Sequence, residues 1–134
     1  MIDFLLFTAE PKWVVVFSVS IVLLICFLQS GIDKVIDRKG NLKWLNDHFS
    51  STIFKGFVPL LLMVVTILEL LTSLLLFLGI IGLNIVLIQY GLALSLITFI
   101  CLFSGQRIAK DYVGAYVLVV YIILTLLGIW SFTL

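Results

Sequence analysis

The stretch that decides the fold is residues 70–106, LLTSLLLFLGIIGLNIVLIQYGLALSLITFICLFSGQ, which contains no charged side chain. A helix that crosses a bilayer needs about 20 apolar residues, so this run is too long for one crossing. Three turn-forming residues interrupt it near the middle: Gly79, Gly82 and Asn84. The pattern predicts a tight helical hairpin whose two spans cover about 56–78 and 85–104.

The rest of the chain has the same character. Of its 134 residues, 63% are hydrophobic and 11% are charged, whereas a soluble domain has roughly 25% charged residues. This composition excludes a soluble monomer, because a chain of this size buries only about two-thirds of its surface. Two further uncharged runs are predicted to span the membrane, 13–32 and 112–132.

Helices are favoured over strands because the apolar runs are long and do not alternate with polar residues. Barrel strands have segments of about ten residues with a period of two, and no such segment occurs in the sequence. We therefore predict a single all-α domain covering residues 1–134. Its expected architecture is a transmembrane antiparallel four-helix bundle.

Residues 33–55 form the one substantial polar segment, DKVIDRKGNLKWLNDHFSSTIFK. Asn41 is a plausible N-cap for a short helix over 42–49. Leu42, Leu45 and Phe49 fall on one edge of that helix. An apolar edge and a nearby tryptophan are typical of a helix at the lipid headgroup boundary. The alternative is an ordinary loop.

Lysine and arginine are unevenly distributed between the two predicted sides of the membrane. The connections 33–55 and 105–111 contain seven of them: Lys34, Arg38, Lys39, Lys43, Lys55, Arg107 and Lys110. The opposite side contains Lys12 alone. Because cytoplasmic loops are enriched in positive charge, both termini are predicted to be non-cytoplasmic.

Glu69 is the one charged residue within a predicted span. Placing a charge near mid-membrane costs about 2.5–3.5 kcal/mol, so the acid must be neutral, paired, hydrogen-bonded or wetted by a cavity. Thr66, Thr72 and Ser73 share its helix face and predict a polar stripe toward the bundle interior. Residues at similar depth on other spans are candidate partners: Ser20, Gln89, Ser95, Tyr121 and Thr125. Two interpretations stay open, a ligand-binding or proton-accepting acid, and a structural acid that joins helices.

A second polar cluster is expected at the cytoplasmic end of the bundle. Its candidate residues form the mouth of the internal cavity: Gln29, Lys34, Arg107 and Lys110. Asp33 or Asp37 is expected to pair with one of the last two. The functional interpretation is an anion-binding or headgroup-binding mouth. The alternative is anchoring of the helix ends by cations that reach the interface.

No motif in the sequence predicts catalysis or a metal site, so neither is expected. Cys26 and Cys101 form no CxxC pair and are expected to be small apolar fillers. His48 has no second His or Cys near it in the sequence. No basic stripe predicts nucleic-acid binding.

Several short motifs resemble those of the DoxX family of small bacterial four-helix membrane proteins. They are FLQSGIDKVIDRKG at 27–40, Pro59, Glu69 ahead of a leucine-rich run ending in Gly79, and GQRIAKDY at 105–112. The resemblance covers roughly 13–130 and implies a bacterial inner-membrane protein. Some relatives are described as the membrane subunit of a thiosulfate:quinone oxidoreductase, and others as partners of redox or detoxifying enzymes. Matched by position, the resemblance implies that the functional residues are Lys34, Glu69 and Arg107.

The expected function is that of a DoxX-like membrane subunit without catalysis of its own. It would bind a partner protein within a larger membrane complex or homo-oligomer. It would also bind a quinone or lipid-like ligand, and its outer surface would contact the lipid bilayer. One alternative is a membrane subunit of a quinone-linked oxidoreductase. Another is a small proton-coupled carrier. The sequence has neither a redox Cys pair nor a His pair for haem, which argues against an autonomous oxidoreductase.

Overall fold

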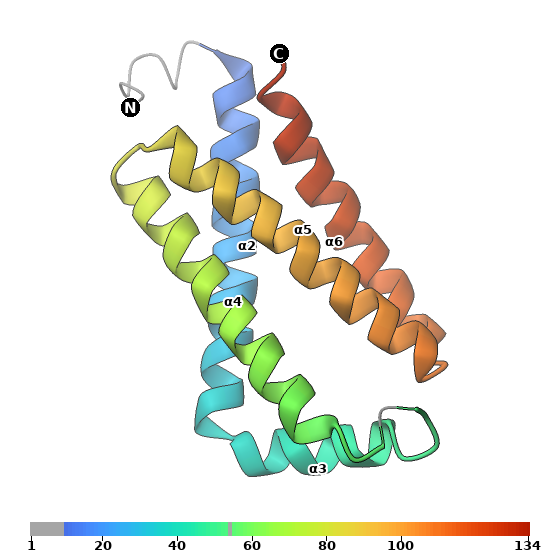
Figure 1. Cartoon of the computed structure of the whole chain (residues 1–134). Helices are drawn as coiled ribbons and strands as arrows, with labels where there is room; N and C mark the ends of the chain where they lie inside the picture. Colours follow the sequence, from blue (N-terminus) through green and yellow to red (C-terminus); the bar gives the residue numbers. More distant parts are fainter. Residues whose placement is uncertain (1–9, 54) are drawn as a thin grey trace.

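The computed structural model describes residues 10–53 and 55–134, which fold into five α-helices (Figure 1). The helices are α2 Pro11–Ile36, α3 Arg38–His48, α4 Val58–Ile81, α5 Ile85–Ile108 and α6 Tyr112–Ser131. Neither described range contains a strand. All helices except α3 are long and apolar enough to cross a membrane. The all-helical prediction is therefore confirmed, and the four long helices support a multi-pass membrane protein.

The long helices begin near the predicted positions but several end later. Both α5 and α6 start at the predicted residues, Ile85 and Tyr112. Pro59 lies in the first turn of α4, where its missing N–H leaves no intrahelical bond unmade. The C-terminus of α2 extends to Ile36 rather than residue 32. The polar residues after 32 therefore continue the helix instead of beginning a loop.

The turn between α4 and α5 is shorter than predicted. Gly79 does not end the first span, because α4 continues to Ile81. Gly79 is instead a contact point: a Cβ added there would lie 2.7 Å from Ile88 Cγ1 and 3.0 Å from the Ile88 amide nitrogen. Asn84 caps α5, its side chain accepting hydrogen bonds from the amides of Val86 and Leu87. These two residues bring the adjoining ends of α4 and α5 into close contact.

Helix α3 begins earlier than the sequence predicted, and the predicted cap is wrong. Its N-cap is Asp37, whose carboxylate accepts from the Gly40 amide at 3.2 Å. Asn41 lies inside the helix, and its Nδ2 donates to the Asp37 carbonyl at 2.8 Å and to Asp33 Oδ2 at 3.3 Å. Asp37 takes the cap position because it is the single residue between α2 and α3, and a carboxylate there also suits the helix dipole.

The four long helices form a closed ring of contacts. Helix α2 packs on α4 and α6, and α5 packs on the same two helices. Their shared core includes fully buried Leu23, Leu76, Ile88 and Leu92. Trp13, near the start of α2, meets Phe132, which caps the end of α6, at a ring-centroid distance of 5.7 Å. Helix α3 crosses the opposite end of the long helices (Figure 1).

The outward faces of the long helices are apolar. Large side chains such as Ile25, Val113 and Ile123 are exposed. Exposure of apolar surface on this scale is disfavoured in water but suits helices surrounded by lipid. The apolar residues thus serve both the core and the outer surface, as a membrane location requires.

Candidate functional site

A buried ion pair joins α2 to α4. Glu69 is the twelfth of the 24 residues of α4, and its side chain is 2% exposed. Lys34, in the last turn of α2, has a side chain that is 17% exposed. Its Nζ lies 3.1 Å from Glu69 Oε1 and 3.4 Å from Oε2. The acid in the middle of α4 is therefore balanced by a lysine from the end of α2.

The geometry of α-helices explains how residues from such different positions meet. Each Cα–Cβ bond tilts toward the N-terminus of its helix. Lys34 therefore leans back along α2, where the Ser30 hydroxyl accepts a hydrogen bond from Nζ at 2.7 Å. Glu69 leans toward the start of α4, which lies near α3 (Figure 1). The two side chains lean toward each other.

Gly31 brings α2 close enough to α4 for the pair to form. A Cβ added at Gly31 would lie 2.8 Å from Leu70 Cδ2 and 3.6 Å from Glu69 Cβ. A separation under 3.0 Å is not tolerated without a shift of the neighbouring side chain. The absence of a side chain at Gly31 thus allows the backbones to approach, and Lys34 lies almost one turn further along α2.

The hydroxyl stripe does not solvate the carboxylate. Thr72 and Ser73 are buried beside Glu69, and Thr66 is half-buried. Six hydroxyls expected near the acid each donate to the carbonyl four residues earlier in their own helix, at 2.6–2.8 Å: Ser20, Thr66, Thr72, Ser73, Ser95 and Thr125. The side-chain partner that the described residues supply to the carboxylate is Lys34.

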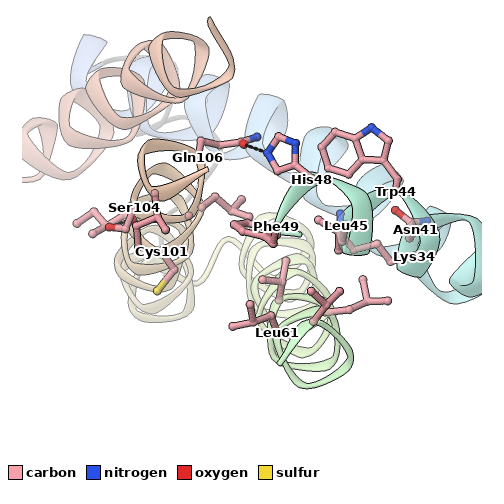
Figure 2. A pocket seen from close by; sticks show the side chains of 17 residues that line it. Lys34, Asn41, Trp44, Leu45, His48, Phe49, Leu61, Cys101, Ser104 and Gln106 are labelled. Atoms are coloured by element: carbon pink, nitrogen blue, oxygen red, sulfur yellow. Dashed lines mark hydrogen bonds between the residues drawn. The ribbon is translucent and has the colours of Figure 1, made fainter. Parts of the chain in front are cut away.

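A cavity of about 500 Å³ lies between α3, α4 and α5. Figure 2 shows Leu61 of α4, Cys101 and Ser104 of α5, and the side chains of α3 around it. Most of its walls are apolar. The polar residues that line it are Lys34, Asn41, His48, Ser104 and Gln106. Because Lys34 belongs to both the cavity wall and the ion pair, the two features form one site.

One face of α3 covers this cavity. Asn41, Trp44, Leu45 and His48 line it, and their spacing of three, four and seven residues places them on the same side of the helix. His48 Nε2 lies 2.7 Å from Gln106 Oε1 of α5 and 3.8 Å from Asp111 Oδ2 (Figure 2 shows the former contact). The indole of Trp44 stacks on the imidazole at 4.5 Å. These contacts fasten the C-terminal end of α3 to the end of α5.

The residues predicted for the cytoplasmic mouth do not gather around this cavity. Lys34 lines it, whereas Gln29 and Lys110 are exposed and do not. The Arg107 guanidinium lies 4.5 Å from the ring centroid of Tyr112. It therefore covers the start of α6 instead of facing the cavity.

Other predicted partners have different roles. The ion pairs predicted for Asp33 and Asp37 do not form in the described part of the chain, because both carboxylates serve the start of α3. Asp111 caps α6 by accepting from the Gly114 amide. Tyr121 stacks on Phe99 at 5.5 Å, and Phe99 in turn contacts Phe27 at 4.7 Å. Tyr121 thus belongs to the aromatic packing between helices.

The sequence did not predict His48, Cys101 or Gly105 as residues of the site, whereas Gln106 belongs to the polar cluster expected at the cytoplasmic end. His48 and Gln106 are 58 residues apart in the sequence. They are in contact because the fold places the end of α3 near the end of α5. The face formed by Asn41, Trp44, Leu45 and His48 was nevertheless visible as helical spacing. The edge predicted in its place included Leu42, which does not line the cavity.

Within 10–53 and 55–134, no three or more His, Cys, Asp or Glu side chains are grouped so as to hold a metal ion. No family model, no curated protein and no solved structure matches the chain. The resemblance to the DoxX family therefore stays a prediction from the motifs.

Proposed function

We propose that this chain is a multi-pass protein of the bacterial inner membrane that binds an amphiphilic, lipid-like molecule in the cavity between α3, α4 and α5. A quinone is the candidate suggested by the resemblance to the DoxX family. The chain then acts as a non-catalytic membrane subunit. The single observation that carries this proposal is the cavity itself, with apolar walls and a buried ion pair at its edge.

The proposed arrangement in the membrane is an antiparallel four-helix bundle with α3 at the cytoplasmic interface. Of the lysines and arginines of 33–55 and 105–111, Lys34 and Arg107 lie in the last turns of α2 and α5, Lys110 lies in the α5–α6 connection, and the others lie in or just after α3. Under the positive-inside rule, that side faces the cytoplasm and the termini lie on the other. Trp44 of α3 is exposed beside the cavity, as an indole at a headgroup boundary would be.

The size and lining of the cavity suit an amphiphile. Pockets for small molecules occupy about 300–1,000 Å³ and have mostly apolar walls with a few polar groups, and this cavity has about 500 Å³. Ile100, Cys101 and Ser104 line it and are exposed. On a helix that crosses a membrane, this side of α5 opens toward lipid. An apolar tail can therefore enter sideways from the bilayer.

The test is native mass spectrometry of the protein extracted in a mild detergent. Gly105→Leu is designed to fill the cavity, because a Cβ added at Gly105 meets only Phe49 Cζ within 4 Å, at 3.6 Å. Val117→Leu, on the exposed side of α6, is the matched control. We expect a stoichiometric bound amphiphile in the parent and the control but not in Gly105→Leu. Equal retention by all three proteins, or retention by none, contradicts the proposal.

The same spectra test the expected partner protein, since a complex or homo-oligomer adds a defined mass. No observation on the described residues favours the quinone-linked oxidoreductase or the proton-coupled carrier over a binding subunit. Both stay predictions from the sequence.

A further inference from the structure

We propose that the cavity selects an uncharged amphiphile whose head group accepts a hydrogen bond from Lys34. This inference rests on the proposed function and names the class of ligand. It excludes anionic lipids and fatty-acid anions from the site. The head groups that qualify share an uncharged oxygen that accepts a hydrogen bond. This oxygen belongs to a hydroxyl, an ester carbonyl or a ring carbonyl.

Lys34 has more hydrogen-bond donors than its two partner residues require. An ammonium group has three N–H donors and no acceptor. Ser30 Oγ takes one at 2.7 Å, and the Glu69 carboxylate takes another. Both Glu69 oxygens lie near Nζ, Oε1 at 3.1 Å and Oε2 at 3.4 Å, and no described residue other than Ser30 and Glu69 accepts a hydrogen bond from it. Since Lys34 also lines the cavity, the remaining donor is available to a bound head group.

The charge of Lys34 is already balanced within the protein. Lys34 is the one Lys, Arg, Asp or Glu residue in the cavity lining within the described ranges, and Glu69 already balances it from behind the wall. An anionic head group would have to share Lys34 with a carboxylate that is 2% exposed. Like charges at one cation repel, and a buried carboxylate that loses its partner is strongly disfavoured. An uncharged oxygen accepts the third hydrogen bond without this penalty.

Two other polar side chains of the cavity wall already have partners within the protein. His48 is already bonded to Gln106 and faces Asp111 at 3.8 Å. Asn41 donates to Asp33 and Asp37. Neither side chain brings an unbalanced positive charge into the cavity. Among the described residues of the lining, Lys34 is therefore the Lys or Arg donor that the ligand meets.

The experiment uses Trp44, which lines the cavity, as a fluorescent reporter. The sequence has three tryptophans, so Trp13→Phe and Trp130→Phe leave Trp44 as the single emitter. Two brominated quenchers differ only in the head group: dibromostearyl alcohol, and dibromostearate at a pH where it is ionised. Quenching that Gly105→Leu abolishes is counted as binding in the cavity.

We expect the alcohol to quench Trp44 at a concentration about tenfold lower than the anion, which corresponds to about 1.4 kcal/mol. Glu69→Gln should reverse this order, because Lys34 then carries an unbalanced charge. Asp47→Asn removes one negative charge from the exposed side of α3, so it controls for net charge and should leave the order unchanged. An anion that binds the parent as well as the alcohol does contradicts the inference, and so does an order that Glu69→Gln leaves unaltered.

A second variant keeps the test valid if Glu69→Gln fails to fold. Lys34→Met with Glu69→Met removes the donor without leaving a charge. It should weaken binding of the alcohol about tenfold and should not strengthen binding of the anion. Unchanged affinity for the alcohol contradicts a contact with Lys34.

Two unbrominated competitors distinguish the source of the head group, a short-chain diacylglycerol and a decyl-substituted quinol. Whichever restores Trp44 fluorescence at the lower concentration identifies a glycerolipid or a quinol ring as the source of the head group, and restoration by neither contradicts the inference. The outcomes separate the two proposals. If no quenching is sensitive to Gly105→Leu, the cavity binds no amphiphile and the proposed function fails. If both quenchers bind in the cavity and the anion binds as well as the alcohol or better, only the inference about the head group fails.

Discussion

The two ends of the α4–α5 hairpin have opposite packing. Next to the turn, Gly79 and Gly91 allow the helices to touch: Cβ atoms added at these positions would lie 2.7 Å from Ile88 Cγ1 and 2.6 Å from Leu76 Cδ2. At the other end the same two helices border a cavity of about 500 Å³ covered by α3. Gly105 is at this end, and a Cβ there would make only an ordinary contact.

The difference shows how one pair of helices combines stability with a binding site. Small residues at the turn end bring the backbones together, which is the usual way for membrane helices to associate. At the α3 end, polar contacts take over: the Lys34–Glu69 pair and the His48–Gln106 hydrogen bond. These contacts hold the surrounding helices in place without filling the space between them.

The largest effect is expected at the ion pair. Lys34→Met leaves the buried Glu69 without a partner, which typically costs about 3–5 kcal/mol. The free energy of unfolding, measured in mixed detergent micelles, should fall by this amount. Adding Glu69→Met should recover most of the loss, because apolar replacement of a whole buried pair is often neutral. If the single variant is as stable as the parent, the pair does not hold the site together.

A smaller loss is expected at the tight end. Gly91→Ala places a methyl group 2.6 Å from Cδ2 of Leu76, which is fully buried. Overpacking of this kind costs about 1–3 kcal/mol. The same unfolding measurement checks the value. A stabilised variant would show that the turn end is not close-packed.

The contact between α3 and α5 should contribute less. His48→Ala removes the hydrogen bond to Gln106 and the imidazole that stacks on Trp44, a loss of about 1 kcal/mol. Because the bond fastens the end of α3, amide hydrogen exchange should accelerate in α3 more than in the long helices. Lys43→Ala, on the exposed side of α3, is the control and should leave exchange unchanged. Equal acceleration in both variants contradicts a specific role for His48.

The smallest effect, with the opposite sign, is expected from Gly105→Ala. Its new methyl group has room beside Phe49, and alanine is favoured over glycine inside a helix by about 0.5–1 kcal/mol. The variant should therefore be slightly more stable than the parent. Together with Gly91→Ala it forms a matched pair, because the same substitution in the same helix should change sign between the two ends. The comparison of the two ends is wrong if both variants shift stability in the same direction.

Much of the fold could be predicted from local sequence, because apolar runs and turn residues act locally. Asn84 marked the turn and caps α5, as a short polar residue before an apolar run indicates. The end of α2 was predicted too early, because Asp33 and Lys34 look like loop residues. Lys34 stays helical because Ser30 and Glu69 accept hydrogen bonds from its ammonium group, and Glu69 lies on another helix.

The site could be predicted only in part. Lys34 and Glu69 were both candidates, but residues 35 positions apart could not be paired from spacing alone. Their pairing depends on the close approach at Gly31 and on the lean of side chains along their helices. The cavity depends on how two helices diverge from a tight turn, which is a property of tertiary packing. Gly91 forms a small-xxx-small pair with Ser95, a pattern typical of close helix packing, but no residue pattern in α5 indicates a space at Gly105.

The most direct test of the central claim is photo-crosslinking in native membranes with a fatty alcohol that carries a diazirine on its chain. The account predicts that mass spectrometry will find the label on residues that line the cavity, such as Leu62 and Cys101, and that Gly105→Leu will remove it. A label spread over the exposed faces of α2 and α6, unaffected by Gly105→Leu, would contradict the account.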